Sequence, residues 1–253
     1  MLLSCENLVI RFGGLVAIND VDLAVGKGEI LGLIGPNGSG KTTIFNMISG
    51  IYRPASGRIQ LNGKDIAGKR PDVVTRSGIA RTFQNIRLFP SMTVWENVMV
   101  GRHCRLRESI FDDIFHTPRK RHEEKKAERY LNELLGMFRL NRYKEEMAKN
   151  LAYGLQRELE IVRALATEPQ LVLLDEPAAG MNAQETGELM RLIRQVRDMG
   201  FTVLLVEHDM KLIMSICDRI AVLNYGRKIA EGTPSEVQAN TEVIEAYLGR
   251  RVN

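Results

Sequence analysis

The feature that most constrains this chain is a glycine-rich loop between a short apolar run and a helix signal. The loop follows Ile30–Ile34, has the pattern G-x-x-x-x-G-K-[ST], and consists of Gly35, Pro36, Asn37, Gly38, Ser39, Gly40, Lys41, Thr42 and Thr43. Its glycines let backbone N–H groups turn inward around an anion, because no Cβ blocks a positive φ. A helix expected from Lys41 to Ser49 adds the positive end of its dipole. The loop is therefore expected to cradle nucleotide phosphates, with Lys41 on the β and γ phosphates and Thr42 on Mg²⁺.

The length and composition fit a globular protein of one or two domains. Of the 253 residues, 44% are hydrophobic and 26% charged, which excludes the disordered, collagen-like and disulfide-scaffold classes. Three short runs are almost entirely apolar, as strands covered on both faces should be: Ile30–Ile34, Leu171–Leu174 and Thr202–Val206. We therefore expect an α/β fold with a mostly parallel core sheet.

Antiparallel strands are expected near both ends of the chain. Leu2–Ile10 and Val16–Val25 are typical of edge or antiparallel strands. Ile220–Leu223 and Arg227–Ala230, joined through a turn that ends at Gly226, predict a late hairpin.

Between about Thr93 and Asn150 the strand signal gives way to charged helical sequence. An apolar stripe at i, i+3, i+4 spacing predicts one amphipathic helix, and its members are Ala127, Tyr130, Leu131, Leu134, Leu135 and Phe138. The basic run at 119–126 is interleaved with glutamates, which favours a solvated helix face over a nucleic-acid surface. We expect an inserted helical subdomain and no nucleic-acid partner.

Two adjacent carboxylates follow the second buried run. Asp175 and Glu176 come directly after Leu171–Leu174, and the carboxyl edge of an α/β sheet is where a ligand crevice is expected. Asp175 can hold Mg²⁺ through water, and Glu176 can polarise the attacking water. Next to a phosphate loop, this is favoured over the alternative of two surface acids at a strand end.

With these residues in place, the sequence resembles the ATP-binding subunits of ABC transporters from about Leu3 to Gly249. The resemblance implies a single ABC ATPase domain at 1–253 with the P-loop NTPase fold. About 1–92 and 168–253 would form its core with an antiparallel β subdomain, and about 93–167 a helical signature subdomain. The cofactors implied are ATP and Mg²⁺.

The resemblance also assigns roles to residues outside the phosphate loop. Gln84 falls at the glutamine that senses the γ-phosphate and Mg²⁺, His208 falls at the switch histidine, and Phe12 falls at the aromatic residue that stacks on adenine. Taken alone, His208 and Phe12 would be read as structural residues. The family signature, which contacts ATP held by a partner subunit, falls at the head of a helix expected from Gln156 to Thr167. Its residues are Leu151, Ala152, Tyr153, Gly154 and Leu155.

Two positions depart from the family pattern. Ala152 stands where the signature normally has Ser, and Asn182 stands where an Asp is usual. Both belong to the surface that would complete the opposite subunit's site, whereas the chain's own nucleotide-holding groups are intact. Without the Ser hydroxyl, the signature has one hydrogen-bond donor fewer for the negative charge that develops on the γ-phosphate, and this weakens stabilisation of the transition state. We therefore expect an asymmetric pair in which the Lys41 and Glu176 site is catalytic and the other site is slower.

Within the family, the likeness is greatest to the longer ATPase subunit of branched-chain (hydrophobic) amino-acid importers. It rests on the stretches 12–14, 175–182, 207–210 and 243–249. This resemblance implies a second, different ATPase subunit, two transmembrane permease subunits and an external solute-binding protein. It also implies a peripheral position at the cytoplasmic face of the inner or plasma membrane. The apolar segment Ile86–Trp95 would receive a permease helix, although Leu88, Phe89 and Trp95 could equally be subdomain core.

Three other classes compete with the importer. A lipopolysaccharide-type ABC exporter ATPase shares the short length and the Tyr-Leu-Gly tail, but it works as a homodimer in which the weakened signature would spoil both sites. A soluble ABC protein would need coiled-coil insertions or tandem ATPase domains, for which this chain has no room. A regulatory GTPase would need an Asn-Lys-x-Asp motif, which the sequence lacks.

Overall fold

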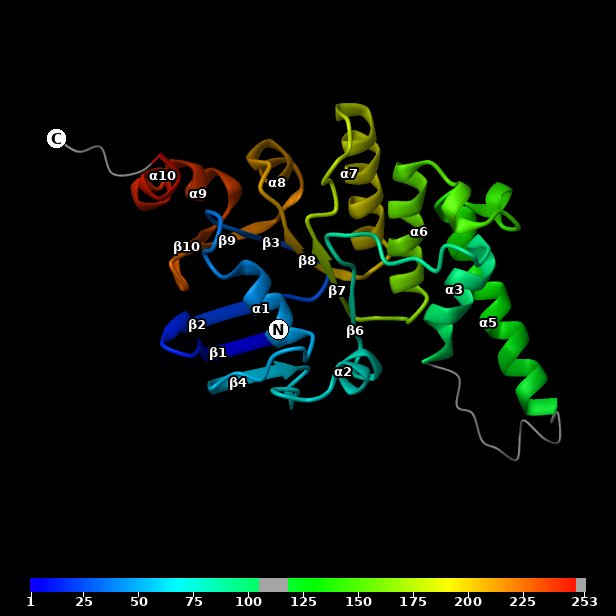
Figure 1. Ribbon diagram of the computed structural model, residues 1–253, viewed down its shortest axis with the longest axis horizontal. Coiled ribbons are helices and arrows are strands. Elements are labelled where there is room, and N and C mark those ends of the chain that lie inside the picture. The colour runs from blue at the N-terminus through cyan, green and yellow to red at the C-terminus, as the bar shows by residue number, and fades with distance from the viewer. Residues whose placement is uncertain (105–117, 249–253) are drawn as a thin grey trace. The chain divides into compact units, whose positions relative to one another are not determined.

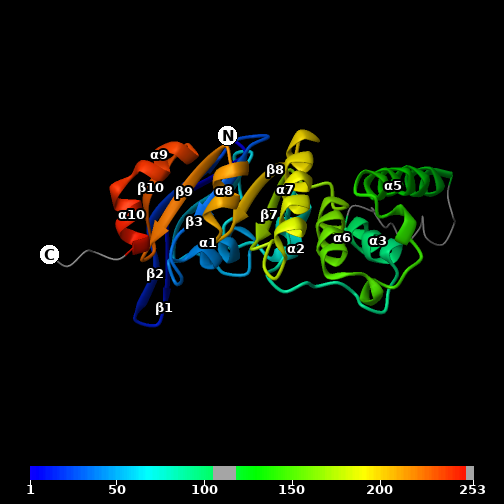
Figure 2. The ribbon, with the colours of Figure 1, turned by 90° about the horizontal axis from the view of Figure 1, so that it is seen from above.

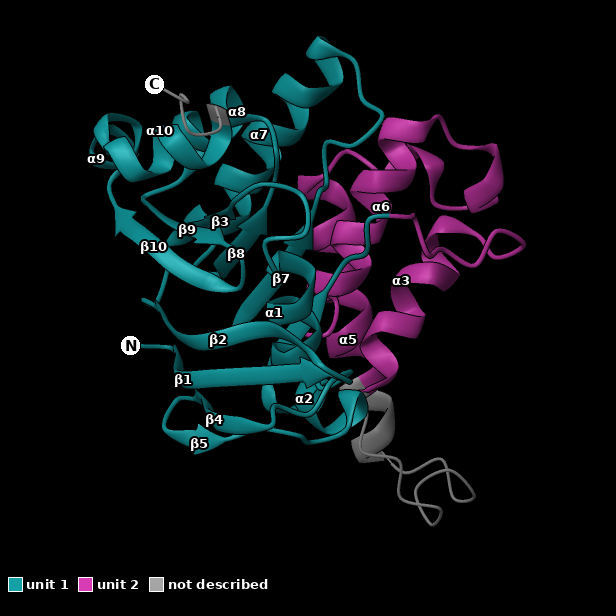
Figure 3. Ribbon diagram, turned by 60° about the vertical axis from the view of Figure 1, so that its left-hand side comes forward, with its two compact units in different colours: residues 1–84, 170–253 teal, residues 85–169 magenta. Residues whose placement is uncertain are grey.

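The computed structural model describes residues 1–104 and 118–248, leaving out the side chains of 118–123 and 248. The chain divides into two compact units, shown in two colours in Figure 3. Unit 1 consists of Met1–Gln84 and Gln170–Asn253, and unit 2 of Asn85–Pro169.

A six-stranded sheet forms the centre of unit 1, in the order β10-β9-β3-β8-β7-β6. Its strands are β3 (Ile30–Ile34), β6 (Ile79–Arg81), β7 (Leu171–Asp175), β8 (Thr202–Val206), β9 (Arg219–Asn224) and β10 (Arg227–Gly232). All neighbouring pairs are parallel except β9 and β10. Every residue of β3, β7 and β8 is buried, as their apolar sequences require. The expected strands and the late hairpin are confirmed, but the three-residue β6 was not predicted.

The second sheet of unit 1 is antiparallel, in the order β2-β1-β4-β5. Its strands are β1 (Leu3–Phe12), β2 (Leu15–Val25), β4 (Ser56–Leu61) and β5 (Lys64–Asp65). The sequence predicted β1 and β2, though β1 continues to Phe12. It did not predict β4, which is short and exposed over its first half, or β5, which has only two residues, both charged.

One helix lies between the two sheets of unit 1, and others cover the far face of the parallel sheet (Figure 1). The central helix is α1 (Lys41–Ile48), whose Ile44 and Phe45 belong to a fully buried core shared with both sheets. Figure 2 shows α9, α8 and α7 following one another along the parallel sheet. The outer helices are α7 (Ala183–Asp198), α8 (Met210–Ile216), α9 (Pro234–Ala239) and α10 (Thr241–Leu248); α2 (Pro71–Ser77) precedes β6.

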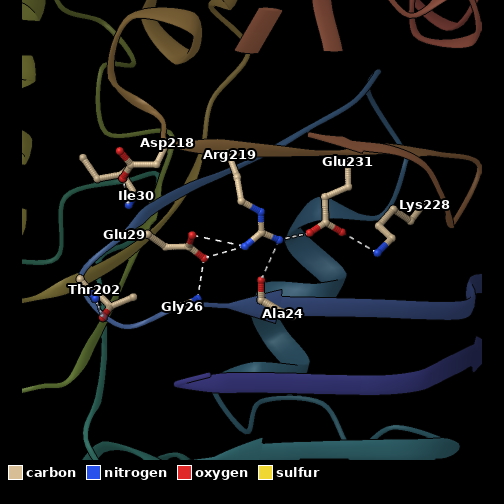
Figure 4. A network of polar contacts seen from close by, with 10 residues as sticks. Ala24, Gly26, Glu29, Ile30, Thr202, Asp218, Arg219, Lys228 and Glu231 are labelled. Atoms are coloured by element: carbon tan, nitrogen blue, oxygen red, sulfur yellow. Dashed lines mark hydrogen bonds and ion pairs between the residues drawn. The ribbon is translucent and has the colours of Figure 1, made fainter. Parts of the chain in front are cut away.

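A network of charges connects the two sheets (Figure 4). Arg219, at the start of β9, is ion-paired with Glu29 and with Glu231 of β10, and its guanidinium also donates to the carbonyl of Ala24 in β2. Glu231 is further paired with Lys228 at 2.6 Å. The network lies at the start of β3, at the edge of the sheet opposite the glycine-rich loop.

The regular structure described in unit 2 is helical, apart from one bridge between Thr93 and Met147. Its elements are α3 (Val94–His103), α5 (Pro118–Met137), two short 3₁₀ turns at Asn141–Tyr143 and Ala148–Asn150, and α6 (Tyr153–Leu165). The predicted stripe of α5 is confirmed, since Ala127, Leu131, Leu134 and Leu135 are buried and Phe138 is buried just beyond the helix. The side chains of the basic run at 119–123 lie outside the described residues. None of the helices described in either unit is long and apolar enough to cross a membrane.

Candidate functional site

The glycine-rich loop joins β3 directly to α1 and has the backbone that its sequence predicts. Gly35, Gly38 and Gly40 all have positive φ. A Cβ on Gly35 would lie 2.1 Å from the carbonyl oxygen of Leu223, and one on Gly40 would lie 2.4 Å from Ile18 Cδ1. Only glycine therefore fits at these two positions. The loop is also held from outside, since the Gly226 N–H donates to the Ser39 carbonyl at 3.0 Å.

The interior of the loop fits a phosphate group. Gly38 has open space where a Cβ would stand, and the Ser39 hydroxyl is buried without a hydrogen-bond partner among the described residues. Lys41 is buried, and its ammonium donates to the carbonyls of Gly35 at 2.7 Å and Pro36 at 3.1 Å. A bound anion would accept a hydrogen bond from the Ser39 hydroxyl and a charge-assisted hydrogen bond from the Lys41 ammonium.

The environment of Lys41 links the loop to the strand ends. Burial lowers the pKa of its ammonium below the ordinary value, and the carboxylates of Glu176 and Asp175 act in the opposite direction. The loop, its lysine and the two acids therefore lie at one edge of the parallel sheet, where ligands bind in open α/β folds. At the start of α1, Thr42 is exposed and Thr43 half-buried, while Asn37 and Gly38 form the exposed rim of the loop.

Asp175 at the end of β7 is 5% exposed and ion-paired with Arg81 of β6, Nη2 to Oδ2, at 2.8 Å. The other terminal nitrogen of Arg81 donates to Asn46 Oδ1 and Ser49 Oγ at the end of α1. Sequence reasoning missed Arg81, because β6, the short strand that carries it and places it beside Asp175 of β7, was not predicted. The only available signal was a basic residue inside an otherwise apolar run.

Three of the predicted residues meet beside Asp175, although they come from three different segments. Gln84 Nε2 donates to Glu176 Oε2 at 2.8 Å, and His208 Nδ1 lies 3.8 Å from the same oxygen. Glu176 itself has φ +46°, in the left-handed region. A residue with a side chain holds this conformation only where its surroundings enforce it, and here the Glu176 N–H donates to the Val206 carbonyl at 2.9 Å.

The donors around this edge fit a magnesium ion. Thr42 supplies a hydroxyl, Gln84 an amide oxygen and Asp175 a carboxylate, all of them the hard oxygen ligands that Mg²⁺ prefers. The ion pair with Arg81 uses Oδ2 of Asp175 and does not involve its Oδ1. No group of three or more His, Cys, Asp or Glu side chains able to hold a metal occurs in the described part of the chain.

Phe12 ends β1 with 44% of its surface exposed, and its ring meets the Tyr52 ring edge-on at 5.2 Å between centroids. The alternative that it is a core residue is therefore wrong for the free chain. Its role in stacking on adenine stays a prediction.

The signature residues lie in unit 2, at the start of α6. This helix begins at Tyr153, so the prediction that it starts at Gln156 is wrong. Ala152 is the N-cap, with extended backbone and no side-chain hydrogen bond; it and Tyr153 are exposed, whereas Leu151 is buried and Gly154 and Leu155 are half-buried. The signature therefore forms the first turn of the helix, and the positive end of the helix dipole there favours an anion.

Sequence reasoning also missed a buried ion pair on α6. Arg157 Nη1 lies 3.0 Å from Glu160 Oε2, and both side chains are fully buried. Glu160 Oε1 also accepts from the Arg87 N–H at 3.1 Å. The pair thus fixes the segment that follows Gln84 to the signature helix within unit 2. Opposite charges at i, i+3 on the apolar face of the helix were the available signal.

Asn182 caps α7. Its Oδ1 accepts from the N–H groups of Gln184 and Glu185, and Glu185 accepts in return from the Asn182 N–H. Asn is among the best N-cap residues, so the departure from Asp leaves this structural function intact.

A phosphate loop between strand and helix, two acids and a histidine at the same sheet edge, and a separate helical unit carrying a signature define an ATP-binding cassette. The chain belongs to the ABC transporter family of ATPases, whose model matches residues 18–179. A second model, described as a branched-chain amino acid ATP-binding cassette transporter, matches residues 227–253.

Individual relatives match the chain over nearly its full length. It is 46% identical to the high-affinity branched-chain amino acid transport ATP-binding protein BraF of Pseudomonas aeruginosa, over 98% of both chains. It is equally identical, with the same coverage, to the corresponding protein LivG of Escherichia coli. The lipopolysaccharide export system ATP-binding protein LptB of Haemophilus influenzae is 33% identical over 99% of this chain and 98% of its own.

The fold is likewise that of solved ATP-binding cassettes. The ADP conformation of one cassette from an ABC transporter superposes with a TM-score of 0.85, at 32% identity over 98% of both chains. The predicted fold class, ATPase activity and nucleotide binding are therefore confirmed at the level of the family.

Proposed function

We propose that this chain is the ATP-hydrolysing subunit of an importer for branched-chain or hydrophobic amino acids. The observation that carries the proposal is the 46% identity to two branched-chain amino acid transport ATP-binding proteins over 98% of each chain. The separate match of residues 227–253 to a branched-chain family model supports it. We propose further that 1–253 form one ABC ATPase domain, with its core near 1–92 and 168–253 and its signature subdomain near 93–167.

The chain's own groups hold the nucleotide. The N–H groups of the loop 35–40 and the Lys41 ammonium bind the phosphates, because both are donors at a helix N-terminus. Phe12 offers an exposed ring for adenine. Thr42, Asp175 and Gln84 would hold Mg²⁺, which supplies positive charge to the γ-phosphate as it is transferred.

Hydrolysis then depends on the cluster of Glu176, Gln84 and His208. The Glu176 carboxylate accepts the proton of the attacking water, and the bond from Gln84 Nε2 at 2.8 Å fixes its orientation. His208 donates to a phosphate oxygen in either protonation state. Because three segments supply these groups, a small displacement of any one of them would slow the reaction.

The partners we propose are a second, different ATPase subunit, two permease subunits and an external solute-binding protein. They would place the chain at the cytoplasmic face of the membrane. In the ATP-bound pair, Leu151 to Leu155 would face the ATP of the other subunit. Because Ala152 lacks the hydroxyl of Ser, we propose that the site it completes is the slower one.

A pull-down of the Glu176→Gln variant tests the proposal. With Mg²⁺ and ATP in source membranes, this variant should bind ATP but not hydrolyse it, so that the closed complex accumulates. We expect a second ATPase with a Ser signature and two permease chains to be recovered with it, and leucine uptake to be lost. Recovery without membrane proteins would contradict the transporter role.

The exporter remains the second candidate, because the chain is also 33% identical to a lipopolysaccharide export ATPase. A homodimer recovered with export-type membrane chains in the same pull-down, with leucine uptake unaffected, would favour it over the importer.

A further inference from the structure

A buried carboxylate that takes no part in the proposed hydrolysis lies beside Glu176 and His208. Glu207 follows β8, between Val206 and His208, and is 1% exposed. Its Oε1 accepts from the Ala178 N–H at 2.8 Å, and its Oε2 accepts from the His208 N–H at 3.3 Å. One side chain therefore contacts both the segment after Glu176 and the segment that carries His208.

Folding stability alone does not account for a carboxylate here. Taking a charge out of water is costly, and an apolar side chain of similar size is often as stable in such a place. Glu176 is a like charge nearby: burial raises the pKa of Glu207, Glu176 raises it further, and the amides of Ala178 and His208 and the His208 imidazole lower it. The buried Glu207 carboxylate is therefore better explained by the groups that it holds in place than by a contribution to folding stability.

The geometry shows what Glu207 holds. His208 Nδ1 lies 3.8 Å from Glu207 Oε2 and 3.8 Å from Glu176 Oε2, so that the imidazole faces two carboxylates. Ala178 belongs to the same tight turn as Glu176, in which the Ala179 N–H donates to the Glu176 carbonyl at 3.2 Å. Fixing the Ala178 amide therefore helps to enforce the left-handed backbone of Glu176.

We propose that Glu207 is a positioning residue: its Oε1 fixes the Glu176 turn through the Ala178 amide, and its Oε2 fixes the backbone that carries the His208 imidazole. It does not touch the nucleotide phosphates; it acts through Glu176 and His208. This inference rests on the roles proposed above for those two residues.

The test compares Glu207→Met with Glu207→Gln in the transporter complex. Glu207→Met keeps the length of the side chain but removes both acceptors, and we expect its turnover number to fall by about 10²-fold, as a misplacement of about 1 Å can do. Affinity for ATP should stay within about twofold, because the phosphate loop is untouched. Glu207→Gln keeps one acceptor oxygen for the Ala178 amide and should recover part of the loss.

A double-mutant cycle separates positioning from general damage. On a His208→Ala background, Glu207→Met should cost much less than in the parent, because residues that act together are not additive. Glu29→Gln is the matched control: like Glu207, Glu29 accepts from a backbone amide, that of Gly26, but it is only partly buried and lies at the opposite sheet edge. It should leave turnover unchanged.

Either of two results would overturn the inference: turnover of Glu207→Met within twofold of the parent, or equal loss of ATP affinity and turnover. If Glu207→Met does not fold, the inference is tested with Glu207→Gln alone. A Glu207→Gln variant with the turnover of the parent would contradict a role for both carboxylate oxygens. Measuring Glu176→Gln in parallel distinguishes failure of the proposed active site from failure of the positioning role of Glu207. If Glu176→Gln stays active, the proposed site is wrong; if it is inactive while Glu207→Met is active, only the positioning role is wrong.

Discussion

At the scale of single residues, the site depends on a backbone conformation that residues other than glycine rarely adopt. Glu176 has a left-handed backbone, with φ +46°, which costs on the order of 1 kcal/mol or more. The bond from its own N–H to Val206 and the contact of Ala178 with Glu207 enforce it. In this conformation the Glu176 carboxylate meets Gln84 and His208, as the catalytic role proposed for it requires.

The signature residue Ala152 gives a prediction at this scale. Ala152→Ser should raise turnover at the site that it completes by about threefold or more, because it restores a donor to developing charge. It should also stabilise the chain by about 1 kcal/mol, because α6 has no side-chain N-cap. Single-turnover hydrolysis in the complex and thermal melting of the full chain measure the two effects.

The Ala152→Asp variant separates the effect on turnover from the effect on stability. Asp caps a helix as well as Ser, but its charge would repel a phosphate, so the melting temperature should rise while turnover falls. Unchanged turnover in Ala152→Ser would remove the basis for an asymmetric pair.

At the scale of elements, buried polar side chains hold the functional loops. Asn97 of α3 is fully buried; its Oδ1 accepts from the Phe89 N–H, and its Nδ2 donates to the carbonyls of Phe89 and Thr93. This fixes the loop before α3 while Phe89 remains 43% exposed. Trp95 and Leu88 are half-buried, so of the three candidate docking residues Phe89 is the most accessible.

Phe89→Asp should therefore uncouple transport. We expect leucine uptake in proteoliposomes to fall by about tenfold or more, because a charge would replace the exposed aromatic ring that is expected to receive a permease helix, and aromatic residues are frequent hot spots of interfaces. ATP affinity should stay within about twofold. Phe89→Leu, which keeps the apolar surface, is the control and should retain most of the uptake. Parallel loss of ATP binding and uptake in Phe89→Asp would indicate a folding defect instead.

At the scale of the whole molecule, unit 1 depends on a connection between its two sheets. The Arg219 network joins β9 and β10 to β2 and to the residue before β3 (Figure 4). It lies at the opposite end of β3 from the phosphate loop, so stability and nucleotide binding can be changed separately.

Arg219→Ala should destabilise the chain by about 2 kcal/mol, because Glu29 and Glu231 lose a charged donor. For a chain of this size, that corresponds to a melting temperature lower by about 4–8 °C. Affinity for ATP, titrated at a temperature where the variant is folded, should remain unchanged. A tenfold loss of affinity would show that this edge is coupled to the phosphate loop.

Parts of this protein that depend on local order could be predicted from the sequence. The loop 35–43, the strands before it and before Asp175, and the stripe of α5 follow from backbone freedom and apolar periodicity among near neighbours. Gln84 could be placed only by resemblance, whereas His208 was placed by resemblance together with its position after a third apolar strand, Thr202–Val206. The tertiary structure alone decided that Arg81 pairs with Asp175, that Glu176 is left-handed and that Glu207 is buried between two loops. A polar residue near an apolar run acquires its partner only when strands distant in sequence pair, because the free energy of a buried charge depends on its neighbours in space.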